Sequence, residues 1–196
     1  IVFGDWSSDV CSSDLEAVLR RALENDPENL NLRMALFNLF TSKKDFKSAE
    51  AEIQEAIRLN PKDVELHLVL AGYHFRQKNA DLAERSLRKA IEIDAGDIRP
   101  YLMLADIYNS ENAPEKALAL YQEALKIKPD DFALLNALGR QQFRMQSIEA
   151  AEKSIGEIFK KNPNNFEARM LSAEIKVYQK DYRSEERRVG KECRSR

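Results

Sequence analysis

The chain contains two histidines, His67 and His74, and imidazole is the side chain that most often binds zinc or transfers protons near neutral pH. On one helix, their separation of seven positions corresponds to roughly 10.5 Å along the axis, which is too far for both rings to bind one ion. The equivalent positions of the repeat described below hold Tyr101 and Tyr108. The sequence therefore predicts that both histidines pack in a core.

Paired carboxylates are the second candidate for chemistry, because two of them can act as general acid and general base. Asp130 lies beside Asp131, and Glu111 lies four residues before Glu115. We expect all four at helix starts, where negative charge interacts favourably with the helix dipole. Residues 16–182 contain no Gly-rich phosphate loop, no His-Glu-x-x-His string and no serine elbow. The sequence predicts no catalytic residue, no cofactor and no metal site.

These residues belong to a sequence that repeats every 34 residues. Four prolines follow this period, at Pro27, Pro61, Pro129 and Pro163, and Ala95 occupies the remaining position. Small and apolar residues recur with the same period: Ala49, Ala83, Ala117, Ala151; Ala22, Ala56, Ala90, Ala124; Leu36, Leu70, Leu104, Leu138; and Ala71, Ala105, Gly139, Ala173.

This pattern resembles the tetratricopeptide repeat (TPR), a helix-turn-helix unit with a period of about 34 residues. The resemblance covers residues 16–182 and implies an all-α fold, an α-solenoid in which antiparallel helix pairs stack into a right-handed superhelix. The expected TPR array consists of a half-unit, four full units at about 30–63, 64–97, 98–131 and 132–165, and a second half-unit.

Apolar residues at three- and four-residue spacing predict the individual helices. A proline ends each second helix, and the Asp or Asn that follows it can cap the next helix. Pro100 and Pro114 are expected in the first turns of their helices. The predicted pairs span 28–42 and 45–60, 64–76 and 80–94, 98–110 and 114–128, and 132–144 and 148–162, with single helices at 16–26 and 166–179 and another helix from Lys180.

The resemblance also implies a binding surface, because the first helices of successive TPR units line a concave groove that holds a partner segment. The residues expected on this groove are Asn38, Thr41, Leu68, Gly72, Phe75, Arg76, Arg99, Leu102, Asp106, Asn109, Asn136, Arg140, Phe143, Arg144, Met170, Glu174 and Tyr178. Aromatic and Arg side chains are frequent anchors of interfaces, and Arg can hold a carboxylate through two hydrogen bonds. We therefore expect a ligand segment with acidic residues beside apolar ones. The alternative is that some of these residues pack between neighbouring units.

One subset of TPR proteins binds a C-terminal carboxylate of chaperones through a Lys-Asn-Asn-Lys-Arg clamp. Here Met34 stands at the position of the first Lys and Val69 at that of the second Asn, and Asn38 alone matches. This class of ligand is not expected.

Both flanks of the chain, residues 1–15 and 183–196, depart from the repeat. The period requires a small residue at positions 15 and 185, where Leu15 and Glu185 stand instead. The strings Ser12–Leu15 and Arg183–Glu186 match translations of the two strands of a common sequencing adapter, GCTCTTCCGATCT and AGATCGGAAGAGC. We therefore expect both flanks to be adapter-derived, and such segments are excluded from functional reasoning. The natural protein is expected to extend past both.

The charge balance gives no reason to expect nucleic acid or an anionic membrane as a partner. The net charge of −2 is the same without the flanks, which carry six basic and six acidic residues. This balance gives no sign of a basic patch for nucleic acid, and no apolar run approaches the roughly 18 residues of a membrane span. The expected partner is a protein or peptide, with no nucleic acid and no direct membrane contact.

The sequence thus predicts a non-catalytic scaffold for protein–protein interaction, of bacterial type and part of a larger protein. The alternative is the TPR region of a larger enzyme, of glycosyltransferase or protease type, whose catalytic domain lies outside residues 16–182. The oligomeric state stays open, and both cytoplasm and bacterial envelope fit the sequence.

Overall fold

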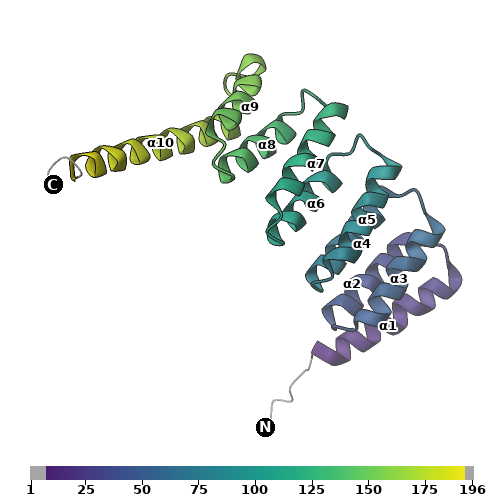
Figure 1. Cartoon of the computed structure of the whole chain (residues 1–196). Helices are drawn as coiled ribbons and strands as arrows, with labels where there is room; N and C mark the ends of the chain where they lie inside the picture. The colour runs from purple at the N-terminus through teal and green to yellow at the C-terminus, as the bar shows by residue number, and fades with distance from the viewer. Residues whose placement is uncertain (1–7, 193–196) are drawn as a thin grey trace, which may run out of the picture. The chain divides into compact units, whose positions relative to one another are not determined.

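The structure is a computed structural model that describes the backbone of residues 8–192 and the side-chain environment of residues 14–180. Within that range the chain forms ten α-helices and no strand (Figure 1). They are α1 (Ser8–Asn25), α2 (Leu30–Ser42), α3 (Phe46–Leu59), α4 (Val64–Arg76), α5 (Ala80–Ile93), α6 (Arg99–Ser110), α7 (Pro114–Ile127), α8 (Phe132–Arg144), α9 (Ile148–Lys161) and α10 (Phe166–Glu192).

The helices divide into two compact units, with the boundary between Ile93 and Asp94. The first unit contains the pairs α2–α3 and α4–α5, preceded by α1. The second contains the pairs α6–α7 and α8–α9, followed by α10. The boundary lies in the connection where Ala95 replaces the proline of the other units. Consecutive packed helix pairs confirm the all-α solenoid class; the handedness of a superhelix stays a prediction.

The starts of α2, α4, α8 and α10 show the predicted caps, whereas the N-cap residue of α6, Ile98, makes no side-chain cap. The side-chain oxygen of Asp131 accepts hydrogen bonds from the backbone N–H groups of Ala133 and Leu134 at 2.9 and 3.1 Å. Asn29, Asp63 and Asn165 cap α2, α4 and α10 in the same way. These residues satisfy backbone donors that a helix N-terminus leaves free, which typically contributes about 1 kcal/mol per cap.

The turn inside each helix pair uses a residue in the left-handed conformation. Lys44, Lys78, Asn112 and Gln146 have φ values of 60°, 62°, 58° and 60°. In the first of these turns, the backbone N–H of Asp45 donates to the Phe40 carbonyl at 2.9 Å, and that of Lys44 donates to the Thr41 carbonyl at 3.1 Å. This double hydrogen bond closes the end of a helix and reverses the chain.

Two expected helix boundaries are wrong. The period places the next left-handed turn at Lys180, but α10 continues to Glu192. The chain also forms helix from Ser8, well before the expected start at residue 16. A turn at Lys180 would be stabilised by a second helix packing on the first through a small residue. Position 185 holds Glu instead of a small residue, so a second helix would not pack well there. The chain keeps its helical hydrogen bonds instead of forming the turn.

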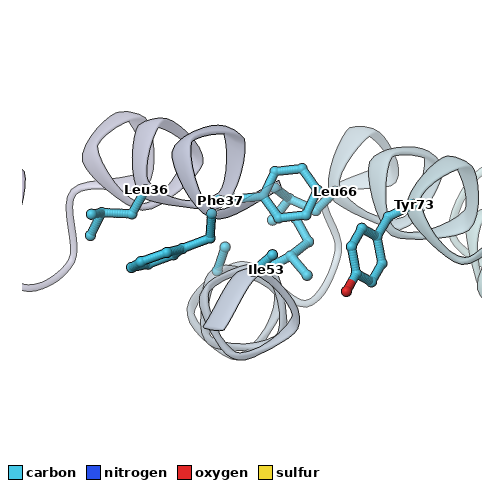
Figure 2. Close-up of a cluster of buried hydrophobic side chains, with 8 residues drawn as sticks. Leu36, Phe37, Ile53, Leu66 and Tyr73 are labelled. Atoms are coloured by element: carbon cyan, nitrogen blue, oxygen red, sulfur yellow. The ribbon is translucent and has the colours of Figure 1, made fainter. Parts of the chain in front are cut away.

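The core of the first unit lies between helices α2, α3 and α4. Figure 2 shows Leu36 and Phe37 of α2, Ile53 of α3, and Leu66 and Tyr73 of α4, which belong to one cluster of buried side chains. Ala49 and Ala56 are fully buried in the same cluster. Their small side chains let α3 approach its neighbours closely, since a larger group at a packed crossing costs about 1–3 kcal/mol.

The core of the second unit has the same construction at α8, α9 and α10. Ala151, Ile155 and Ile158 of α9 pack with Leu135 of α8 and with Ala168, Leu171 and Ile175 of α10. Burial of each large apolar side chain contributes about 1.5–3 kcal/mol to the free energy of folding.

The adapter origin of the two flanks stays a prediction, and Trp6 and Cys193 lie outside the described residues.

Candidate partner-binding surface

The predicted groove residues all lie on first helices, which are α2 and α4 in the first unit and α6, α8 and α10 in the second. A fixed offset of 34 residues places them in columns. One column holds Leu68, Leu102, Asn136 and Met170, and a second holds Asn38, Gly72, Asp106, Arg140 and Glu174. A surface built on rigid helices can hold an extended ligand at several points.

In the first unit, Phe75 and Arg76 form the most accessible part of this surface. Phe75 is 41% exposed although it is a large apolar residue, and Arg76 and Asn38 are exposed as well. Within the described residues, no hydrogen bond or ion pair involves the Arg76 guanidinium. Leu68 is only 6% exposed and packs in the core, so it offers little surface to a partner.

In the second unit, alternating charges run across α6, α8 and α10. Asp106, Arg140 and Glu174 occupy one column, and Nη1 of Arg140 lies 3.6 Å from Oε2 of Glu174. Both side chains of this ion pair are close to half exposed, at 46% and 44%. An exposed pair of this kind contributes at most about 1 kcal/mol, so a ligand carboxylate could replace Glu174 at little cost.

Arg99 is held at the start of its own helix. Its Nε and Nη2 donate to the Asp97 carboxylate at 3.0 and 2.8 Å. Arg99 donates these hydrogen bonds to a carboxylate that is only 14% exposed, and they keep the pKa of Asp97 below its ordinary value. Arg99 is therefore less available to a ligand than the sequence suggested.

Gln141 joins α8 to the preceding helix pair and was not predicted from the sequence. This side chain is 2% exposed, and its Nε2 donates to Oδ1 of Asn109 at 2.9 Å and to the Pro114 carbonyl at 3.1 Å. Its Oε1 accepts a hydrogen bond from Nη1 of Arg144 at 3.3 Å. The only signal in the sequence is that a polar residue stands where the other units carry Leu39, Tyr73, Ile107 and Ile175.

Arg144 also lies close to two acidic groups. Partial burial raises the pKa of the Asp106 carboxyl, and the positive charge of Arg144 acts in the opposite direction. Burial likewise raises the pKa of Tyr121 to about 12, with the Asp106 charge adding to the shift. The Arg144 guanidinium thus lies close enough to Asp106 to affect its pKa, and a ligand carboxylate would compete with Asp106 for it.

Aromatic residues form an edge of the surface at α8 and α10. The rings of Phe143 and Tyr178 meet edge to face, with centroids 5.6 Å apart. Tyr178 remains 38% exposed and Met170 45% exposed. Phe143 is half-buried by this contact, whereas Phe75 at the equivalent position is exposed.

Asn136 is buried and connects α8 to the start of α10. It is 4% exposed, and its Nδ2 donates to Oε2 of Glu167 at 3.2 Å and to Oδ1 of Asn165 at 3.4 Å. Its Oδ1 is buried without a hydrogen-bond partner. Asn136 therefore packs between helices, as the alternative interpretation of these columns expected.

Comparison with known families agrees with this architecture. Two sequence profiles described as tetratricopeptide repeat match residues 34–98 and 109–175, together about two thirds of the chain. The chain belongs to the tetratricopeptide repeat family. TPR arrays are interaction modules, so this chain is a protein-interaction scaffold. None of the curated proteins matches it.

Several solved TPR-like structures share the fold. A structure described as pilF of Pseudomonas aeruginosa is 17% identical over 87% of this chain and 78% of its own, with a TM-score of 0.59. YrrB, a TPR protein with an unusual peptide-binding site, is 16% identical over 83% of this chain and 84% of its own, with a TM-score of 0.54. TTC0263, a thermophilic TPR protein of Thermus thermophilus, is 16% identical over 85% of this chain and 96% of its own, with a TM-score of 0.57.

The histidines of this TPR protein pack as predicted. His67 and His74 are 8% and 5% exposed, and the His74 ring lies 5.5 Å from that of Tyr73. Burial lowers the pKa of His74. Among the described residues, no three His, Cys, Asp or Glu side chains lie close enough together to hold a metal ion.

The carboxylates of the predicted acidic pairs lie at helix ends or form an ion pair with a lysine. Asp131 caps α8, Glu115 lies in the first turn of α7, and Asp130 forms an ion pair with Lys161. Glu111 is the C-cap of α6, so the expectation that it lies at a helix start is wrong.

In the described part of the TPR protein, no helix combines the length and the apolar character that crossing a membrane requires.

Proposed function

We propose that the first-helix face of this TPR scaffold binds a peptide or partner segment in which acidic residues flank an apolar one, and that the scaffold acts by binding rather than by catalysis. The observation that carries the proposal is the exposed pair Phe75–Arg76 on α4. An exposed aromatic beside an Arg whose guanidinium has no ion pair among the described residues offers both kinds of interface anchor at one place.

The second unit supports the same ligand chemistry more weakly. Arg140 and Arg144 lie on α8, but Glu174 and Asp106 are close to them. A ligand carboxylate would have to displace or share these interactions. We therefore propose α4 as the stronger binding surface, in the first unit, and α8 with the Met170–Tyr178 stretch of α10 as a weaker binding surface, in the second unit.

The solved structure of YrrB is described as having a peptide-binding site, and it resembles this chain in fold. The resemblance supports a peptide as the ligand. That the ligand's side chains are acidic and apolar is inferred from the residues of this chain named above.

A peptide array tests the proposal. The full chain is applied to an array of peptides of varied charge and hydrophobicity, and the best binders are measured in solution. Binders should be enriched in Asp and Glu next to Leu, Ile or Phe, and Arg76→Ala together with Arg144→Ala should weaken them while leaving the melting temperature nearly unchanged. Equal binding of the same peptides by the double variant would show that this assignment is wrong.

A further inference from the structure

The exposed charges on the first helices of the second unit alternate in sign. Asp106 of α6, Arg140 of α8 and Glu174 of α10 lie 34 residues apart in sequence, so they occupy the same position on successive first helices. All three residues are exposed. The equivalent residues of the first unit, Asn38 and Gly72, carry no charge. The repeat therefore does not require charges at this position, and we call the three charged residues the charge row of the second unit.

The members of the charge row already interact with charges of the same unit. Nη1 of Arg140 lies 3.6 Å from Oε2 of Glu174, and both side chains are close to half exposed. Asp106 lies close enough to the Arg144 guanidinium for the two charges to interact, although its carboxyl is partly shielded from water. Because exposed ion pairs hold only weakly, a ligand with charges of its own can exchange partners with the charge row.

A ligand with acidic side chains alone fits the charge row poorly. Its carboxylate would pair with Arg140 and displace Glu174, which would then lie beside the ligand without a cation. A bound ligand removes water from the surface, and a charge that loses both its water and its partner costs free energy. A ligand with one acidic side chain between two basic ones leaves no member of the row unpaired.

The spacing of the first helices fixes where these side chains stand in the ligand. Helix α10 contacts α8, and Gln141 of α8 is hydrogen bonded to Asn109 of α6. Packed helices lie about 8–10 Å apart. An extended polyproline-II segment has three residues per turn and advances roughly 9 Å in that turn, so every third side chain faces the same way at a matching distance.

We infer that the second unit binds an extended segment of a partner protein with the charge pattern base-x-x-acid-x-x-base, in which the acid pairs with Arg140 and the two bases pair with Asp106 and Glu174. The pattern is symmetric, so it fits in either chain direction. Asp106 also interacts with Arg144, so the stronger basic contact is at Glu174. The inference rests on the proposed function, because it places the ligand on the first helices, and it adds a requirement for basic residues in the second unit.

Three labelled peptides test the pattern. KPAEPAK carries it, EPAKPAK has the same composition with the acid moved to one end, and EPAEPAE is acidic only. Each is titrated by fluorescence anisotropy against the full chain with Arg76→Ala, which removes the proposed anchor of the first unit. We expect KPAEPAK to bind about threefold or more tightly than EPAKPAK, and EPAEPAE to bind most weakly of the three.

Glu174→Gln separates a role in ligand selection from a role in stability. Without the Glu174 charge, KPAEPAK should bind about threefold more weakly, because one of its bases loses its partner, whereas EPAEPAE should bind about threefold more tightly, because Arg140 is released. A purely structural role would change both affinities in the same direction. Glu157→Gln is the matched control, since Glu157 belongs to an exposed ion pair on the second helix α9, and this variant should change neither affinity.

The outcomes separate this inference from the proposed function. Equal binding of KPAEPAK and EPAKPAK, absence of KPAEPAK binding, or shifts of equal sign in Glu174→Gln would each overturn the inference. The proposed function depends instead on acidic and apolar peptides that bind the unaltered chain through Arg76. If those peptides bind and the pattern peptides fail, only the charge pattern of the second unit is wrong.

Discussion

Nε2 of Gln141 donates a 2.9 Å hydrogen bond to Oδ1 of Asn109, which connects α8 to α6. The same nitrogen also donates to the Pro114 carbonyl on α7, so one buried amide links three helices of the second unit. In the equivalent column three other units use Tyr73, Ile107 and Ile175, which are buried apolar or aromatic residues, and α2 has the partly buried Leu39. Gln141 therefore both fills space in the core and forms hydrogen bonds between helices.

Substitutions at Gln141 should distinguish these two roles. Gln141→Ala removes both the hydrogen bonds and the side-chain volume, and we expect a loss of about 2 kcal/mol in the free energy of unfolding. Gln141→Leu keeps the volume, and Asn109 is exposed enough to bond with water, so we expect a loss below about 1 kcal/mol. Urea unfolding of both variants measures the difference. An equal loss in the two would mean that the hydrogen bonds dominate.

The crossings within helix pairs should not tolerate larger side chains. Ala83 and Ala117 have no exposed surface, so Ala83→Leu and Ala117→Leu should each destabilise by about 1–3 kcal/mol through overpacking. Arg85→Ala, an exposed change two residues from Ala83, should alter stability by less than about 0.5 kcal/mol. Urea melts that give small and equal effects for all three variants would contradict the helix pairing.

Two glycines in the second unit offer a matched test of helix propensity. An added Cβ at Gly156 in α9 would have no neighbour within 4 Å, so Gly156→Ala should stabilise by about 1 kcal/mol. At Gly139 the added Cβ would lie only 3.2 Å from Leu171, so Gly139→Ala should stabilise the protein clearly less than Gly156→Ala. Thermal melts of the two variants test this order. A larger gain at Gly139 would mean that the α8–α10 contact is looser than described.

Stability should depend on pH through His74. Burial lowers the pKa of this imidazole below its ordinary value of 6.5, and the negative charge of Glu50 only partly opposes the shift. The unfolded chain then binds more protons, so the stability contributed by neutral His74 is present above pH 6.5 and is lost as the pH falls from there towards the lower folded pKa.

His74→Phe provides the control, because Phe40 occupies the same column in another unit. The loss of unfolding free energy between about pH 7.5 and pH 5.5 should be smaller in this variant than in the unaltered chain. Equal losses would assign the pH dependence to other groups.

Most of the helix boundaries could be predicted from the sequence because prolines, caps and apolar residues repeat together. The expected helix at 64–76 matches α4, and that at 132–144 matches α8. The end of α10 could not be predicted in this way. The sequence Gln179-Lys180 resembles the turn at Gln77-Lys78, but a turn also needs a second helix that packs, and local sequence alone does not reveal its absence.

The candidate site was less predictable than the fold. The period assigns residues to a face, but it does not tell which charges on that face neutralise one another. The ion pair of Arg140 with Glu174 and the hydrogen bonds of Arg99 to Asp97 depend on side-chain rotamers. Burial of Leu68 and Asn136 depends on the neighbouring helix as well. Which residues remain available to a partner is therefore a property of the packed structure.

Methyl NMR spectra of the full chain with the best peptide from the array test the central claim most directly. The claim is that ligand binds on the first helices, where Leu102 and Met170 lie, whereas Leu82 on α5 and Ile127 on α7 are exposed apolar residues of second helices. We predict that the methyl signals of Leu102 and Met170 shift with added peptide while those of Leu82 and Ile127 stay in place. Shifts at Leu82 and Ile127, with none at Leu102 and Met170, would contradict the account.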